Sequence, residues 1–197
     1  MAIVLPLSMT VHAYAAAGRD LEVPRPCCPS CSQAMSFWGY YSRPVRVDEE
    51  IRVLVRRARC ASCAVSHALV PDFVLPGRLD GVEVIGVAIE EMATGAGARP
   101  VALRAGVPHT TVRDWCRRFV TRAAMLTVGF LAATVALGDL VPRVGAGVMA
   151  SALLAIRSAA AAARRRLKAS GSDWRIAVRV VGGHLLSTNT NPPFLAR

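Results

Sequence analysis

Cys28-Pro29-Ser30-Cys31 and Cys60-Ala61-Ser62-Cys63 are the two stretches of this 197-residue sequence that most constrain its fold. Each cysteine pair places two thiolates at the ends of a tight turn, where they can bind one side of a tetrahedral metal ion. The 28 residues between the pairs exceed the roughly 15–20 that are common in such sites, and a long β-hairpin would account for the excess. We therefore expect a structural Zn²⁺ site with four ligands: Cys28, Cys31, Cys60 and Cys63.

Two neighbouring residues compete for this site. Cys27 would leave three residues before Cys31, whereas Cys28 gives both pairs the same spacing of two residues, so we expect Cys28 to be the ligand. His67 follows the second pair by four residues, and we expect it to be a polar strand-end residue because four cysteines already complete the coordination shell. Two disulfides or four buried free thiols are the alternative, but disulfides require an oxidising compartment and nothing else in the sequence indicates export.

The residues between the two pairs predict a β-hairpin. Residues 35–47 and 51–59 flank the acidic turn 48–50, and the second arm alternates apolar and polar positions as a half-buried strand does. With a cysteine pair at each end of its base, this hairpin predicts a zinc ribbon over residues 24–70, preceded by a strand and a helix in residues 1–23. We expect the metal to supply much of the stability of so small a unit.

Downstream of the ribbon the pattern becomes helical. Residues 71–80, interrupted by prolines and a glycine, predict a linker. Asp80 can cap a helix over residues 81–94, which opens a domain that we place at residues 81–122.

The remaining residues, 123–197, predict an alanine-rich helical region and a turn-rich tail. A helix is expected over residues 147–168, and a further element over residues 173–181. The uncharged run 123–137 is shorter than the ~20 residues that span a bilayer, so we expect a buried or dimer-forming helix there and no membrane association.

The positive charge of the chain lies in its second half. The formal net charge is +11. Residues 1–91 contain nine arginines against ten acidic residues, whereas residues 92–197 contain fourteen arginines and one lysine against three aspartates. An acidic polymer is the natural partner of such a surface, and we expect nucleic acid in preference to membrane.

Residues 99–119 carry the order of side chains that a helix-turn-helix requires. Pro100 suits the first helical position, Ala102 is small where a second helix must approach, and Gly106 occupies the turn, where a positive φ favours glycine. The apolar anchors are Val107, Val112, Trp115 and Phe119. A helical hairpin formed by chance is the alternative. The expected fold class is therefore α+β, with a small N-terminal β zinc ribbon followed by a mostly α-helical region that contains a helix-turn-helix.

In that motif the second helix enters the major groove with its first residues near the base edges. Arg113 is the expected base reader, because a guanidinium matches guanine O6 and N7. The other residues expected near the groove are His109, Thr110, Thr111 and Arg117, and those expected at phosphates are Arg99, Arg104, Arg118 and Arg122. Two alternatives stay open: one of the threonines caps the helix, and Asp114 forms an i, i+4 pair with Arg118.

The Cys28–Cys31 motif followed by a helix-turn-helix resembles the N-terminal DNA-recognition part of insertion-sequence transposases. More closely, the chain is similar to an uncharacterised actinobacterial family associated with mobile elements. The similar stretches cover most of the chain and are residues 25–31, 37–40, 58–63, the helix-turn-helix and 189–193. The resemblance implies DNA binding and no established catalytic activity.

The sequence contains no arrangement typical of a DNA-cleaving enzyme. Two-metal cleavage needs three carboxylates, but Asp139 and Asp173 are the only acidic residues after the helix-turn-helix. We expect a cytoplasmic, non-enzymatic protein with double-stranded DNA as its partner, a transposase or a second copy as a further partner, and no small-molecule substrate. The alternative function is a protein-interaction adaptor that uses the zinc ribbon and the C-terminal helices.

Overall fold

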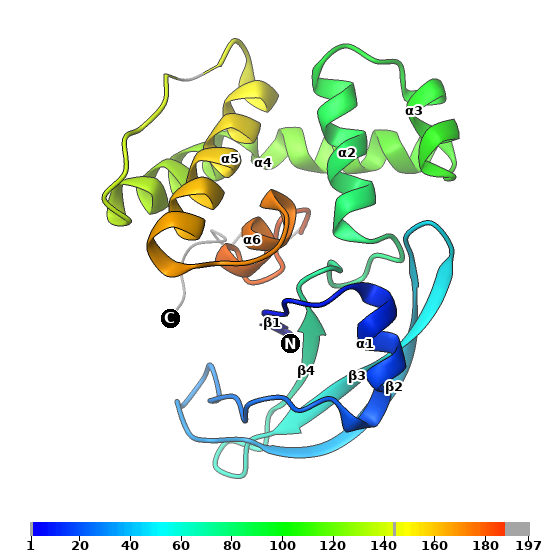
Figure 1. Ribbon diagram of the computed structural model, residues 1–197, viewed down its shortest axis with the longest axis vertical. Helices are drawn as coiled ribbons and strands as arrows, with labels where there is room; N and C mark the ends of the chain where they lie inside the picture. Colours follow the sequence, from blue (N-terminus) through cyan, green and yellow to red (C-terminus); the bar gives the residue numbers. More distant parts are fainter. Residues whose placement is uncertain (1, 144, 188–197) are drawn as a thin grey trace.

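The computed structural model describes residues 2–143 and 145–187. Within them the chain forms six α-helices, one short 3-10 helix (Gly18–Asp20) and one four-stranded sheet, so the fold is a mixed α+β arrangement. Figure 1 shows the sheet and the first helix at one end of the molecule and the other five helices at the other end.

The sheet has the strand order β1-β4-β3-β2. Its strands are β1 (Ala2–Leu5), β2 (Ser36–Arg46), β3 (Glu50–Arg59) and β4 (Ser66–Pro71). β2 and β3 form the expected antiparallel hairpin, with a bulge between Phe37 and Gly39. β4 pairs antiparallel with β3, and β1 pairs parallel with β4. The N-terminal strand is thus an integral edge of the sheet.

Helix α1 (Val11–Ala17) covers this sheet beside β3. It begins at Thr10, whose hydroxyl accepts a hydrogen bond from the backbone N–H of Ala13 at 3.2 Å. Its buried residues Val11 and Tyr14 pack with the apolar side chains of the hairpin. The Tyr14 hydroxyl also donates to the backbone oxygen of Leu54 at 2.8 Å, which fixes the helix to the sheet.

The segment 71–80, which we expected to be a linker, is partly enclosed in the core. Asp72, Phe73, Val74 and Leu75 are all almost completely buried. Phe73 and Val74 belong to the hydrophobic cluster of the sheet, and Leu75 belongs to that of the helices. Asp80 does not cap the next helix either, because its carboxylate accepts from the Arg46 guanidinium at 2.6 Å. The segment therefore joins the sheet to the helices as part of the core.

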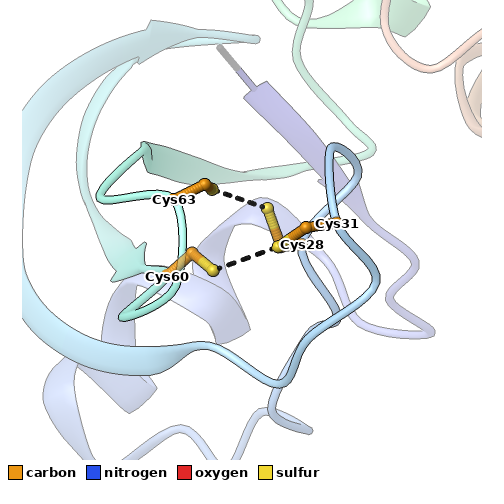
Figure 2. A group of neighbouring side chains, drawn as sticks. All are labelled: Cys28, Cys31, Cys60 and Cys63. Carbon is orange, nitrogen blue, oxygen red and sulfur yellow. Dashed lines mark hydrogen bonds between the residues drawn. The ribbon is translucent and has the colours of Figure 1, made fainter.

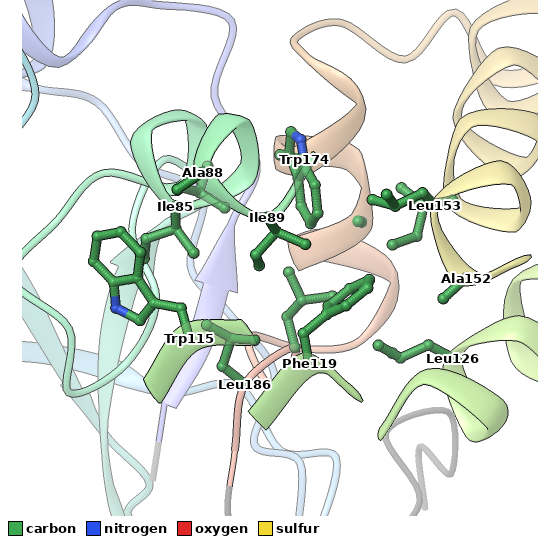
Figure 3. Packing of buried hydrophobic residues seen from close by; sticks show 14 of the residues in the cluster. Ile85, Ala88, Ile89, Trp115, Phe119, Leu126, Ala152, Leu153, Trp174 and Leu186 are labelled. Carbon is green, nitrogen blue, oxygen red and sulfur yellow. The ribbon is translucent and has the colours of Figure 1, made fainter. Parts of the chain in front are cut away.

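The helical half consists of α2 (Val82–Ala93), α3 (Ala98–Ala105), α4 (His109–Ala136), α5 (Val148–Leu167) and α6 (Asp173–Val180). Their apolar faces meet in the largest hydrophobic cluster of the described chain. Figure 3 shows Phe119 of α4 between Ile89 of α2 and Leu126, with Ala152 of α5 beside Leu126. The Phe119 and Trp174 rings lie edge to face with 6.0 Å between their centroids.

Gly86 allows α2 and α6 to approach closely. A Cβ atom at this position would overlap the indole ring of Trp174. The indole N–H donates to the Glu90 carboxylate at 2.9 Å, one turn further along α2. The glycine in the middle of a helix is thus required by packing.

Helix α4 is a single element of 28 residues. It runs without a break through the boundary between residues 122 and 123 at which we expected one domain to end, because its buried residues continue from Val112 to Thr134 along one side. The expected helix over residues 147–168 is present as α5, and the further element expected over residues 173–181 is the helix α6. The expected tail 189–193 lies outside the described residues.

Among the described residues, α4 is also the one helix long and apolar enough to cross a membrane. Only 33% of its most apolar 18-residue window is buried, and Val128 is 70% exposed. The opposite side of the same stretch packs on α5 within the main core.

Candidate functional site

The four predicted cysteine ligands lie together at the base of the hairpin (Figure 2). Their Sγ atoms all lie within 4.8 Å of one another, with 3.5 Å between Cys28 and Cys63 and 3.4 Å between Cys31 and Cys60. A tetrahedral ion with metal–sulfur bonds of about 2.3 Å requires sulfur–sulfur separations of about 3.8 Å. The cluster therefore has the size and shape of a four-thiolate metal site.

The two cysteine turns have the same local geometry. In each turn the residue after the second cysteine, Ser32 or Ala64, has a left-handed backbone with a φ of 59°. The first cysteine then closes the turn with its backbone N–H, from Cys28 to the oxygen of Gln33 at 2.8 Å and from Cys60 to the oxygen of Val65 at 3.0 Å. Neither turn has glycine at its left-handed position, so this conformation could not be predicted from the residue types.

Backbone N–H groups in these turns favour the thiolate form at the first cysteine of each pair. The N–H groups of Ser30 and Cys31 lower the pKa of Cys28, in part with a hydrogen bond from Cys63. The N–H group of Cys63, together with hydrogen bonds from neighbouring thiols, lowers the pKa of Cys60 to about 6. Since a metal binds the thiolate and not the thiol, this environment prepares two sulfurs for coordination.

Of the competing residues, neither Cys27 nor His67 belongs to the cluster. Cys27 is exposed and its backbone bridges to Ala34, whereas Cys28 is buried inside the cluster. His67 does not belong to the cluster and is fully buried on β4, paired with Ala58. Neither ring nitrogen of His67 has a hydrogen-bond partner among the described residues. Burial lowers the pKa of His67, so the ring is neutral. The residue lies at the start of β4, as the strand-end residue that we expected, but it is fully buried.

The second candidate site lies at the start of α4. Gly106 ends α3 with the left-handed backbone expected of the turn (φ 64°), and its N–H bonds back to the oxygens of Ala102 and Leu103. α3 begins at Ala98, two residues before Pro100, and α4 begins at His109 after Pro108. Thr110 and Thr111 do not cap α4, because no side chain caps its first turn.

Six of the nine expected DNA-contact residues are exposed: Arg99, Arg104, His109, Thr110, Arg113 and Arg117. Thr111 and Arg118 are half-buried, and Arg104 is exposed but bonded to the Glu91 carboxylate on α2. Asp114 pairs with Arg118 at 2.7 Å and with Arg117 at 2.6 Å. The charges at the start of α4 are therefore positioned by one central carboxylate.

Arg122 cannot contact a phosphate in this structure. Its side chain is 5% exposed, and its Nη1 donates to the backbone oxygen of Ser187 at 3.2 Å. The helical periodicity of α4 explains the difference, because Arg122 lies three residues after the buried Phe119 and shares its face. The expectation of a phosphate contact at Arg122 was wrong.

The sequence did not reveal the contact of Arg78 with α4 or the exposure of Trp38 on β2. Arg78, which we had placed in a linker, contacts the Asp114 carboxylate at 3.4 Å from 36 positions earlier in the chain. Trp38 on the edge strand β2 is 53% exposed, and the Arg57 guanidinium lies 5.1 Å from its ring centroid. No local pattern could reveal the first contact, because its two residues are brought together only by the fold.

Residues 28–115 match the family model described as Domain of unknown function (DUF6431). The matched region begins at the first cysteine of the cluster and ends at Trp115 in the second turn of α4, so it contains both candidate sites in part or in full. Comparisons with curated proteins and with solved structures found no match.

Proposed function

We propose that this chain is a cytoplasmic, non-enzymatic, sequence-preferring double-stranded DNA-binding protein. The first turns of α4 enter the major groove, α3 and the Gly106 turn support them, and the four cysteines hold a structural Zn²⁺. The protein acts as a regulator or as a recognition component of a mobile element, related in that role to insertion-sequence transposases.

The exposed basic start of α4 carries this proposal. Thr110, Asp114, Arg117 and Thr121 recur at spacings of three and four, so they share one face of the helix, and all of them are exposed or half-buried. Arg113 lies at the border of this face and is exposed. Helices that read DNA present polar and cationic side chains of this kind in their first turns.

Binding to duplex DNA tests the proposal. A site selected from a random library is used to compare the parent protein with Arg113→Ala and Arg117→Ala, and with Arg157→Ala as the matched control. Arg157 is an exposed arginine on α5 that forms a surface pair with Glu90. We expect Arg113→Ala to weaken the selected site by about 1–3 kcal/mol and to relax one base preference. Parent-like binding by both test variants would contradict the groove-reading role.

A structural zinc is the second part of the proposal, and the mutual distances of the four sulfurs support it. Metal analysis should find about one zinc per chain. Cys60→Ser should lose the metal and unfold the sheet half, whereas Cys27→Ser, at an exposed cysteine outside the cluster, should retain both. If the parent protein is fully folded without metal, and if added zinc leaves its unfolding midpoint unchanged, the zinc assignment is refuted.

A protein-interaction adaptor remains the second candidate, and the exposed aromatic side chains of β2 favour it. Trp38, Tyr40 and Tyr41 are all exposed on an edge strand, where aromatic residues can bury against a partner protein. An adaptor would tolerate Arg113→Ala and Arg117→Ala and would lose its partner on Trp38→Ala. A DNA-binding protein would show the opposite pattern.

A further inference from the structure

A cleft of about 340 Å³ lies where three distant parts of the chain meet. Its walls come from the segment 75–78 that follows the sheet, from Arg118 on α4, and from the segment 183–187 that follows α6. Gly183, with a φ of +83°, keeps one wall close, since a Cβ there would lie 3.0 Å from the Pro76 ring. The cleft is therefore a built feature of the packed core and not a gap between independent units.

The charged side chains that line this cleft are two arginines, beside a histidine and several apolar residues. Arg78, Arg118 and His184 line it. Asp114 is the carboxylate that contacts the two arginines, at 3.4 Å from Arg78 Nη1 and 2.7 Å from Arg118 Nε, and it also pairs with the exposed Arg117. One negative charge is thus shared among three guanidinium groups, which leaves an excess of positive charge at the cleft.

Asp114 contacts one nitrogen of each arginine that lines the cleft, and the other guanidinium nitrogens can donate to a ligand. Arg118 uses Nε for Asp114, and within the described residues no hydrogen bond is recorded for its two terminal nitrogens. The backbone oxygen of Arg78 accepts from the Arg43 guanidinium of β2, which fixes the segment 75–78 against the sheet. Both arginine side chains are about one quarter exposed, at 23% and 25%, so a ligand in the cleft can reach them.

We propose that this cleft binds one phosphate group of the nucleic-acid backbone, with Arg78 and Arg118 as the donors. Planar guanidinium groups match the geometry of phosphate oxygens, and half-buried arginines lose less of their attraction to solvent and salt than exposed ones. The inference rests on the proposed DNA binding and extends its surface. The contact runs from the first turns of α4 to the segment that connects the sheet to the helices, so the DNA-binding surface includes a residue outside the helix-turn-helix.

The salt dependence of binding tests this contact. The probe is a random 30-base-pair duplex, and the variants are Arg78→Gln and Arg118→Gln, with Arg157→Gln on α5 as the control. Each lost phosphate contact lowers the slope of log affinity against log salt by about 0.9, which at 0.1 M salt corresponds to about eightfold weaker binding. We expect this change in both cleft variants, equally for selected and random duplexes, and no change in the control. Arg78→Lys should recover part of the affinity.

The outcomes separate the cleft from the proposed function. If the parent protein binds duplex DNA and Arg78→Gln binds it with an unchanged slope, the cleft is not a phosphate site. If the parent binds no duplex, the DNA-binding proposal fails, and a titration with inorganic pyrophosphate then decides whether the cleft takes phosphate from another source. Loss of pyrophosphate binding in Arg78→Gln would retain the phosphate site, and absence of binding in the parent would overturn it. Thermal unfolding of each variant excludes loss of fold as the cause.

Discussion

Arg175 on α6 donates from Nε and Nη2 to one carboxylate oxygen of Asp72, at 2.9 and 2.6 Å, across 103 positions of sequence. Asp72 is fully buried immediately after β4. Its other oxygen accepts from Arg179 Nε at 2.5 Å and from the backbone N–H of Leu7 at 3.0 Å. Both arginines also donate to the Leu7 carbonyl, so one carboxylate joins the N-terminal segment, the sheet and α6.

Asp72→Asn should lower the free energy of unfolding by about 3–5 kcal/mol, because removal of the carboxylate charge leaves the buried Arg175 and the half-buried Arg179 without a counter-charge. Urea unfolding followed by circular dichroism measures the loss. Asp139→Asn is the matched control: its carboxylate pairs with Arg165 at the surface, so its unfolding midpoint should stay close to that of the parent. Equal midpoints for the two variants would show that the buried cluster does not hold the two halves together.

In the second cysteine turn, glycine substitutions at two alanines should change the free energy of unfolding in opposite directions. Ala64 has a φ of 59°, whereas Ala61 is not among the described residues with positive φ, and both are exposed. Ala64→Gly should raise the free energy of unfolding by about 0.5–1 kcal/mol, because glycine removes the left-handed strain. Ala61→Gly should lower it by a similar amount through the greater freedom of the unfolded chain.

Urea unfolding of the purified protein compares the two variants. Stabilisation by both glycines, or by neither, would contradict the backbone geometry of the second cysteine turn. The equivalent change at Ser32 in the first turn should behave like Ala64→Gly, since Ser32 has the same φ.

Local patterns predicted the local elements and their positions. The paired cysteines predicted a four-thiol cluster, and the alternation in residues 51–59 predicted β3, because both depend on residues close in sequence. Gly106 predicted the turn between α3 and α4 for the same reason, since a positive φ there is a property of one residue.

Contacts between distant residues account for what the sequence did not reveal. Asp72 reads as a turn residue until its partners Arg175 and Arg179 are brought to it by the fold. In the sequence Arg122 is one of many arginines. It lies three residues after Phe119, so both side chains fall on the buried face of the continuous helix α4. The proline and glycine content of 71–80 predicted a linker, but four apolar or charged residues there are enclosed by both halves.

Gly86→Ala should destabilise the protein although alanine is the better helix former. The added methyl group would overlap the Trp174 ring, and overpacking of this kind costs about 1–3 kcal/mol, which outweighs a propensity gain of about 1 kcal/mol. Differential scanning calorimetry should show a lower midpoint. Val87→Ala, at the exposed neighbour on the same helix, should change stability by less than about 0.5 kcal/mol. A midpoint for Gly86→Ala at or above that of the parent would refute the close contact of α2 with α6.

Asp114 gives the start of α4 a defined pH dependence. The hydrogen bond from Arg118, with further help from Arg117 and Arg78, holds the pKa of Asp114 below its usual value. In the unfolded chain an aspartate titrates near ~3.9. Because the folded pKa is lower, the contribution of Asp114 to stability is fully present above about pH 5 and is lost as the pH falls through the folded pKa. The difference in free energy of unfolding between the parent and Asp114→Asn should therefore be constant from pH 7 to 5 and should shrink between pH 4 and 2.

The same comparison in an Arg118→Gln background should show a smaller change with pH, since Arg118 is the main cause of the shift. A difference that stays constant down to pH 2 would mean that Asp114 is not the carboxylate that positions these arginines.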